Sequence, residues 1–319
     1  MTDNGPLLRL ENVYKRYSLP GSRTLRAVNG VDLEIRAGEC LSIVGESGSG
    51  KSTLVRMAAR VEPVTEGRIL FSGEPVEHLQ GAGLRGLRRK IQVIFQDPIS
   101  VFSPRMKIGE FLREPLVNYG IVSRKEAGKA AVYLLETVGL DSGYIGRYPH
   151  ELSGGELQRV AIVRAMAVDP LLLICDEPTS ALDVTIQERV IELLNKLRRD
   201  SGAAMMFISH DLALVSGFSD RIAVMFLGYL VESFPGASLG QGAKHPYTQA
   251  LLRSVFTIGQ DRGDEIEVLR GETPSPTEPI AGCPFASRCP YSGELCEKEK
   301  PPLREVGPGH YAACFFIGG

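Results

Sequence analysis

The sequence predicts an α/β fold with a helical insert, and three stretches carry that prediction. Residues 40–44 form a short apolar strand that runs into a glycine-rich loop and then into a helical stretch from Lys51. Residues 171–175 are continuously apolar, which is typical of a strand buried in a parallel sheet. Between these strands, residues 97–169 are rich in Ala, Leu and Glu and follow a helical period, which predicts inserted helices.

The remaining elements follow in chain order. Residues 7–13 and 31–35 alternate between apolar and polar side chains, as strands do. Apolar runs and helical spacing predict further strands at residues 91–95, 203–208 and 221–231, and a helix at residues 185–200.

The composition changes after about residue 235. Gly and Pro become frequent there, and four of the six cysteines lie in that segment. We therefore predict two parts: residues 1–235 as one large domain with a helical subdomain at about 97–169, and residues 236–319 as a small extension.

Charge and hydropathy exclude several classes of protein. The formal net charge of −2 is nearly balanced, whereas general nucleic-acid binders are clearly basic. The basic run at residues 85–90 is better explained as a solvated loop than as a nucleic-acid site. No signal peptide is apparent, and no apolar run reaches the length of a membrane helix. We expect a cytosolic protein that binds no nucleic acid and reaches a membrane only through a partner.

Residues 45–53, GESGSGKST, fit the phosphate-loop pattern G-x-x-x-x-G-K-S/T and lie between a strand and a helix, as that pattern requires. Glycines let backbone N–H groups turn toward phosphate oxygens, and the helix N-terminus adds partial positive charge. Lys51 supplies a charge for the β- and γ-phosphates, and Ser52 a hydroxyl for Mg²⁺. A merely flexible loop is the alternative, which the strand–loop–helix context disfavours. The predicted nucleotide contacts are Gly45, Glu46, Ser47, Gly48, Ser49, Gly50, Lys51, Ser52 and Thr53.

Two acids follow the apolar strand at residues 171–175. Asp176, at the strand end, is predicted to hold Mg²⁺, and Glu177 to polarise the water that attacks the γ-phosphate. An acidic turn without a catalytic role is the alternative, and the phosphate loop in the same chain weighs against it.

Residues 152–159, LSGGELQR, form a third motif. Ser153, Gly154 and Gly155 are placed at the start of a helix, where backbone N–H groups are free to bind an anion. Taken alone, the motif is better explained as an ordinary capped helix.

The order of the motifs closely resembles that of the ATP-binding cassette (ABC) family. After the phosphate loop come FQDP, LSGGE, ICDEPTSALD and ISHD, and the resemblance covers residue 1 to about 235. It implies a P-loop NTPase cassette with a mostly parallel core sheet, an N-terminal antiparallel β subdomain and a helical insert. It also implies that two chains, alike or paralogous, sandwich two ATP molecules with Mg²⁺.

The resemblance implies roles for single residues. Tyr17 looks like the aromatic residue that stacks on adenine, with a core tyrosine as the alternative. Gln96 resembles the residue that senses Mg²⁺ and water, and it would join Glu177 and His210 as a catalytic residue. His210 resembles the histidine that contacts the γ-phosphate, and Asp183 the residue at the dimer seam.

Across that seam, Ser153 and Gly155 would contact the γ-phosphate bound by the opposite subunit. Glu156 stands where Gln is commonest in the family. Because the serine and both glycines are kept, this difference does not call catalysis into question.

The tail resembles the C-terminal extension of oligopeptide, dipeptide and nickel importer ATPases, through residues 244–248 (KHPYT) and 282–291 (GCPFASRCPY). The implied partners are two transmembrane permease subunits, a second ATPase subunit and an extracytoplasmic binding protein, with this chain peripheral on the cytoplasmic face. Peptide import is the leading expectation. Import of nickel or another small solute, and a soluble cassette ATPase, are the alternatives. The segment after Gln96 departs from the importer group at Ile99, Val101 and Ser103.

Four cysteines crowd into the tail, at Cys283, Cys289, Cys296 and Cys314. A reducing cytosol disfavours disulfides, which leaves a metal staple or free thiols. Zinc sites usually use closer pairs, and four cysteines can equally hold a 4Fe–4S cluster, which the resemblance favours. His310 could substitute for a cysteine ligand, but an ordinary surface histidine is the favoured interpretation. We expect this site to lie far from the nucleotide.

Overall fold

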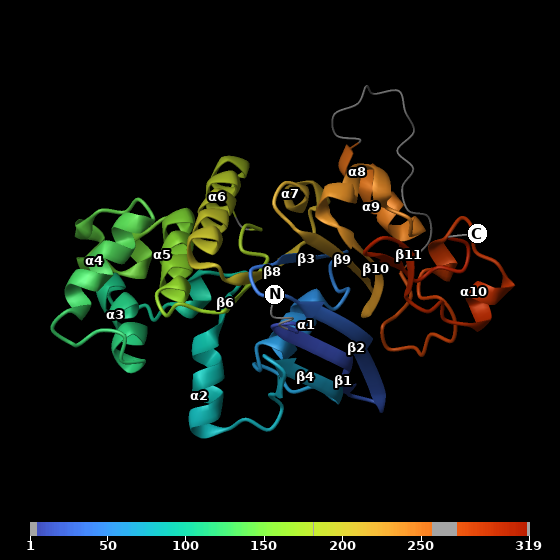
Figure 1. Cartoon of the computed structure of the whole chain (residues 1–319), viewed down its shortest axis with the longest axis horizontal. Helices are drawn as coiled ribbons and strands as arrows, with labels where there is room; N and C mark the ends of the chain where they lie inside the picture. Colours follow the sequence, from blue (N-terminus) through green and yellow to red (C-terminus); the bar gives the residue numbers. More distant parts are fainter. Residues whose placement is uncertain (1–4, 181, 257–272, 318–319) are drawn as a thin grey trace. The chain divides into compact units, whose positions relative to one another are not determined.

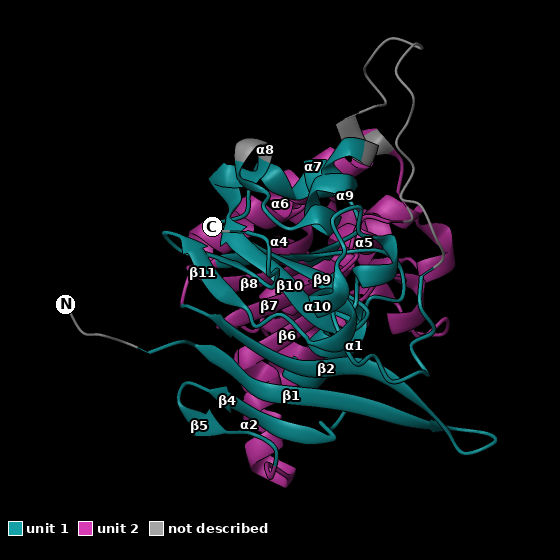
Figure 2. Cartoon of the chain, turned by 90° about the vertical axis from the view of Figure 1, so that its right-hand side faces the viewer, with its two compact units in different colours: residues 1–36, 40–77, 208–319 teal, residues 37–39, 78–207 magenta. Residues whose placement is uncertain are grey.

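The computed structural model describes residues 5–180, 182–256 and 273–317. The chain divides into two compact units (Figure 2). Unit 1 contains residues 1–36, 40–77 and 208–319, and unit 2 contains residues 37–39 and 78–207. The cysteine-containing tail therefore belongs to the same unit as the phosphate loop.

The N-terminal part of unit 1 is an antiparallel sheet in the order β2-β1-β4-β5 (Figure 1). Its strands are β1 (Leu8–Leu19), β2 (Arg23–Ile35), β4 (Glu66–Phe71) and β5 (Glu74–Pro75). Leu8, Leu10 and Val13 point into the core, which explains the alternation in the sequence. Both long strands extend well beyond the predicted ranges, because their partly buried distal ends carry polar residues that mask the apolar pattern.

The second sheet of unit 1 contains the strand that leads into the phosphate loop. Its order is β11-β12-β10-β9-β3, with β3 parallel to β9 and the other pairs antiparallel. The strands are β3 (Cys40–Val44), β9 (Arg221–Phe226), β10 (Tyr229–Pro235), β11 (Arg304–Gly307) and β12 (His310–Ala312). The predicted strand at 221–231 is in fact the hairpin β9–β10. Its turn residues, Leu227 and Gly228, have positive φ angles of 46° and 80°, as a tight hairpin requires.

The helices of unit 1 are α1 (Lys51–Ala58), α7 (Leu212–Ser216), α8 (Leu239–Gly242), α9 (Pro246–Phe256) and α10 (Glu294–Lys298). The tail is tied into the sheet, because β12 pairs with β10 through Glu232 and Ala312. The sequence analysis did not predict β11 or β12, which are short and lack a long apolar pattern.

Unit 2 contains the strands β6 (Ile91–Ile94) and β7 (Leu172–Asp176) and most of β8 (Ala204–Ser209). The last two residues of β8 belong to unit 1. β6 and β7 pair in parallel, and every residue of β7 is buried. The helices are α2 (Gly81–Lys90), α3 (Ile108–Asn118), α4 (Ala127–Thr137), α5 (Gly154–Met166) and α6 (Val184–Ser201). Helices α3, α4 and α5 share one apolar core that includes Phe111, Leu135 and Val160. The predicted α/β class with a helical insert is confirmed.

Within the described parts of the chain, none of the helices combines the length and apolar character needed to cross a bilayer.

Candidate functional site

The phosphate loop joins β3 to α1, and its glycines are required by its shape. Gly45, Gly48 and Gly50 have φ angles of 153°, 78° and 98°. A Cβ atom at Gly45 would lie 2.2 Å from the carbonyl oxygen of Met225, and one at Gly50 would lie 2.3 Å from that of Ala27. The backbone thus packs too closely for any side chain at these positions, and Gly50 caps the N-terminus of α1.

Lys51 turns its ammonium group into the loop. Only 4% of the residue is exposed, and Nζ lies 2.8 Å from the carbonyl oxygens of both Gly45 and Glu46. The Oγ of Ser49 lies 3.4 Å from the same ammonium. The positive charge is therefore held where the loop concentrates its hydrogen-bonding groups, as phosphate binding requires.

Tyr17 lies beside the end of the phosphate loop. Its hydroxyl donates to the Glu62 carboxylate, and it also shares a hydrogen bond with Thr53. The ammonium of Lys15 lies 4.9 Å from its ring centroid. Partial burial and the hydrogen bond to Glu62 raise the pKa of Tyr17. The tyrosine is only partly buried, so its ring retains surface on which a planar group could stack.

In unit 2, the parallel register of β6 and β7 brings Gln96 and Glu177 together. Ile94 pairs with Cys175, so the residues two positions further along each strand come side by side. The Nε2 of Gln96 donates to Oε2 of Glu177 over 3.2 Å. Asp176 is 2% exposed, and Glu177 has a φ angle of 47°, a conformation that non-glycine residues seldom adopt.

The LSGGE segment forms the N-terminus of α5. The Oε2 atom of Glu156 accepts hydrogen bonds from the backbone N–H of Ser153 at 2.7 Å and from its hydroxyl at 2.8 Å. The backbone N–H of Glu156 in turn donates to the Ser153 hydroxyl at 3.4 Å, which completes a capping box. The Tyr144 hydroxyl donates to Glu156 as well, and this bond, followed by those from Ser153, lowers the pKa of Glu156. Ser153 and Gly154 are exposed, so the end of this helix is accessible.

The other predicted residues occupy helix starts or strand ends. Asp183 caps α6 by accepting a hydrogen bond from the N–H of Ile186 at 3.0 Å. His210 follows β8 in unit 1 and is exposed. In unit 1, the structure places Tyr17 beside the phosphate loop. In unit 2, it places Gln96 beside Glu177.

The four tail cysteines line one small cavity together with His245 and Phe285. Burial raises the pKa of Cys283 to about 11 and raises those of Cys289 and Cys314. These four described cysteines form no disulfides. Among the described residues, no group of three His, Cys, Asp or Glu side chains is arranged to hold a metal ion. His310 is not among the lining residues, and its Nε2 lies 2.8 Å from Oε1 of the buried Glu232.

We expected the cysteine site to lie far from the nucleotide, but the segment that carries it contacts the phosphate loop. Arg288 forms an ion pair with Glu46, with Nη1 and Oε2 3.0 Å apart, and the Tyr247 hydroxyl accepts from the backbone N–H of Glu46 at 2.9 Å. The role of Arg288 and Tyr247 beside the phosphate loop could not be predicted from the sequence, because 242 and 201 positions separate them from Glu46. Both residues lie in the motifs KHPYT and GCPFASRCPY, and their place in these motifs is the sequence signal that points to them.

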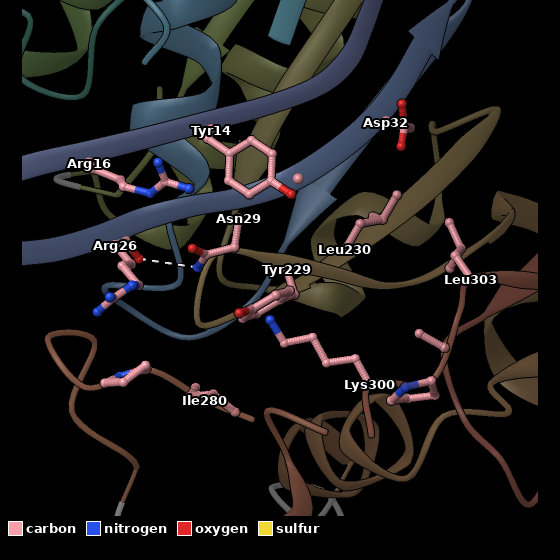
Figure 3. Close-up of a pocket in the computed structure, with 14 residues that line it drawn as sticks. Tyr14, Arg16, Arg26, Asn29, Asp32, Tyr229, Leu230, Ile280, Lys300 and Leu303 are labelled. Carbon is pink, nitrogen blue, oxygen red and sulfur yellow. Dashed lines mark hydrogen bonds between the residues drawn. The ribbon is translucent and has the colours of Figure 1, made fainter. Parts of the chain in front are cut away.

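A separate cavity of about 460 Å³ lies in unit 1, and none of the predicted site residues lines it (Figure 3). It opens between the first two strands, the β9–β10 turn and the tail. Arg16, Arg26, Tyr14, Tyr229 and Lys300 contribute side chains to its wall. The nucleotide-loop residues therefore do not coincide with this cavity.

Comparison with known proteins agrees with this geometry. Residues 28–180 match the family model described as ABC transporter, and residues 231–296 match the model described as oligopeptide/dipeptide transporter, C-terminal region.

Two similar sequences are named as transport proteins. The oligopeptide transport ATP-binding protein AppF of Bacillus subtilis is 43% identical over 91% of this chain and 89% of its own length. A protein of Brucella ovis, named as a candidate peptide import ATP-binding protein, is 44% identical over 97% of both chains.

Among solved structures, the ATP-binding cassette MJ0796, a dimer in a post-hydrolysis state with ADP and Pi, matches with a TM-score of 0.66 and 33% identity. The match covers 72% of this chain and 98% of that one. The phosphate loop, the hydrogen bond between Gln96 and Glu177 and the capped LSGGE helix are consistent with these matches. Because of the similarity to these relatives over most of its length, the chain belongs to the ATP-binding subunits of ABC transporters, in the oligopeptide and dipeptide family.

Proposed function

We propose that this chain hydrolyses ATP to drive the import of peptides through two transmembrane permease subunits. The observation that carries the proposal is the joint presence of a complete nucleotide loop and the oligopeptide-type C-terminal region in one chain. The names of two relatives, which refer to peptide import and oligopeptide transport, support the cargo class. The subunit would work at the cytoplasmic face of the membrane, with an extracytoplasmic binding protein delivering the peptide.

The catalytic roles follow from the chemistry of the side chains. Lys51 would bind the β- and γ-phosphates, and Tyr17 would stack on adenine. Glu177 would accept a proton from the attacking water, and the hydrogen bond from Gln96 would hold its carboxylate in position. His210 would contact the γ-phosphate.

Ser52, Gln96 and Asp176 offer the oxygen ligands that Mg²⁺ prefers. Bound Mg²⁺ would neutralise charge on the β- and γ-phosphate oxygens. Asp176 is buried at the strand end, so its carboxylate is a fixed rather than a mobile ligand.

The working unit would be a dimer of ATPase subunits, alike or paralogous. Ser153, Gly154 and Gly155 would contact the γ-phosphate held by the opposite subunit, and Asp183 would lie at the seam. The support is the exposed, capped helix terminus, where backbone N–H groups can bind an anion. Each ATP would then require both chains.

The four tail cysteines would hold a 4Fe–4S cluster, with zinc as the alternative. Four thiols around one cavity are the donor set that such a cluster uses, with one thiolate to each iron. Burial disfavours the isolated thiolates, so bound iron would supply the positive charge that stabilises them.

Purification from membranes of the source organism, followed by reconstitution into vesicles, tests the proposed function. We expect permease subunits to co-purify, and ATP turnover to rise when peptide and binding protein are added. Stimulation by nickel or another small solute instead of peptide would identify the alternative cargo. Full activity without any membrane subunit would support a soluble cassette ATPase and contradict the proposal.

A further inference from the structure

Glu46, the second residue of the phosphate loop, is held at three points. Its backbone N–H donates to the Tyr247 hydroxyl at 2.9 Å. Its carbonyl oxygen accepts from Lys51 Nζ at 2.8 Å. Its carboxylate accepts from both terminal nitrogens of Arg288, over 3.0 to 3.3 Å. Two of these three contacts come from the tail, so the tail fixes the position of a loop residue.

Arg288 is built into the protein rather than lying on its surface. Its side chain is only 7% exposed, against 30% for Glu46. The guanidinium lies 5.8 Å from the ring centroid of Phe226 and 6.0 Å from that of Phe285. It also donates to the Thr273 hydroxyl at 3.1 Å. A planar guanidinium packed against this pair of touching rings has few alternative positions, so its pairing with Glu46 is directional.

Arg288 and Tyr247 both pack against Phe285, which lines the cysteine cavity. Arg288 directly precedes Cys289, and Phe285 and His245 line the cavity. Tyr247 is fully buried, and its ring centroid lies 5.4 Å from that of Phe285. The Nδ1 atom of His245 accepts from the backbone N–H of Tyr247 at 3.1 Å. Packed side chains thus connect the cysteine cavity to Glu46.

We propose that Arg288 and Tyr247 are positioning residues for the nucleotide site, which make the ATP affinity of the cassette depend on the folded state of the cysteine segment. The loop must bind a triphosphate, and Glu46 places a carboxylate in it. Arg288 compensates that charge and holds it to one side, while Tyr247 fixes the backbone. This role rests on nucleotide binding by the phosphate loop.

The decisive experiment is a double-mutant cycle with Arg288→Met and Glu46→Gln. Affinity for a non-hydrolysable ATP analogue is measured by titration calorimetry on the full-length chain. Arg288→Met leaves the carboxylate of Glu46 uncompensated beside the triphosphate, and we expect a roughly tenfold higher Kd. Glu46→Gln in that background removes the repelling charge, so the Kd should return to within about threefold of the starting protein.

Lys298→Met is the control. Lys298 is also a cation of the tail, but it is exposed, and its ammonium pairs with Glu294 of the same short helix, with Nζ and Oε2 3.1 Å apart. We expect its Kd to be unchanged. Thermal unfolding of each variant separates loss of affinity from loss of fold.

Three results would overturn the inference. The first is an unchanged Kd in folded Arg288→Met. The second is a failure of Glu46→Gln to restore binding in that background. The third, which applies even where Arg288→Met does not fold, is an unchanged Kd in Tyr247→Phe, because this variant removes the hydroxyl that accepts the backbone N–H of Glu46. If the unsubstituted chain binds no nucleotide, the proposed function itself fails.

Discussion

The side-chain amide of Gln96 donates a hydrogen bond to the carboxylate of Glu177, with Nε2 and Oε2 3.2 Å apart. The two residues are 81 positions apart in the chain, and the register of two parallel strands brings them together. Their pairing couples the residue expected to respond to Mg²⁺ to the residue expected to activate water.

Glu177→Gln should bind ATP but hydrolyse it far more slowly. The amide cannot accept a proton from water, and loss of a general base costs about 10²- to 10⁴-fold in rate. Steady-state turnover and nucleotide affinity of the assembled complex are the measurements. Glu188→Gln, an exposed acid on α6, is the control and should keep full activity. An unchanged turnover in Glu177→Gln would show that Glu177 is not the general base.

Lys51→Ala should weaken nucleotide binding itself. The ammonium group is held inside the loop by the carbonyls of Gly45 and Glu46, where it is ready to receive phosphate oxygens. Loss of a charge-assisted hydrogen bond predicts an affinity about 10- to 100-fold lower. Calorimetric titration measures it, with the exposed Lys298→Ala as the control. Equal affinity of Lys51→Ala and the unsubstituted chain would contradict the assignment.

The isolated chain should hydrolyse ATP weakly, with a specific activity that rises with protein concentration. In the proposed dimer each ATP would need the α5 terminus of the other subunit, and that terminus is exposed at Ser153 and Gly154. Activity measured across a dilution series, with oligomeric state followed by sedimentation, tests this. A confirmed monomer whose specific activity does not change with concentration would rule out the shared site.

Glu156→Gln should leave ATP turnover unchanged at pH 7 but change how the free energy of unfolding depends on pH in the acidic range. The folded state lowers the pKa of Glu156 below its ordinary value of 4.5, mainly through the hydrogen bond from Tyr144. Its contribution to stability is therefore complete above about pH 4.5 and is lost as the pH falls through the folded-state pKa. Unfolding followed between pH 7 and 3 should show a smaller acid-induced loss in the variant, because glutamine carries no titrating charge. Identical pH profiles would show that the Glu156 bonds add no stability.

Protein purified without oxygen should be brown and carry about four irons per chain. Cys289→Ser should remove the colour. Because Arg288 precedes Cys289 and pairs with Glu46, we expect weaker nucleotide binding in this variant, and no further loss when it is combined with Arg288→Met. Elemental analysis distinguishes iron from zinc. Colourless protein containing neither metal would leave four ordinary thiols.

The elements that sequence analysis predicted share one property, which is that their signal is local. The phosphate loop, the apolar strand before Asp176 and the LSGGE helix start are each recognisable within about a dozen residues. The contact between Arg288 and Glu46 joins residues 242 positions apart, so no window of sequence contains it. The same holds for β12, which becomes a strand because it pairs with the edge of β10.

The pairing of β12 with β10 also has a consequence for any shortened form of the protein. A chain ending near residue 235 keeps every ABC motif but loses the strand that covers the edge of β10. It also leaves the wholly buried carboxyl group of Glu232 without the imidazole of His310 and the backbone N–H of Lys244. An open sheet edge beside an unsatisfied acid favours self-association. The minimal soluble ATPase fragment of this chain should therefore extend through residue 312, well past the point where its nucleotide motifs end.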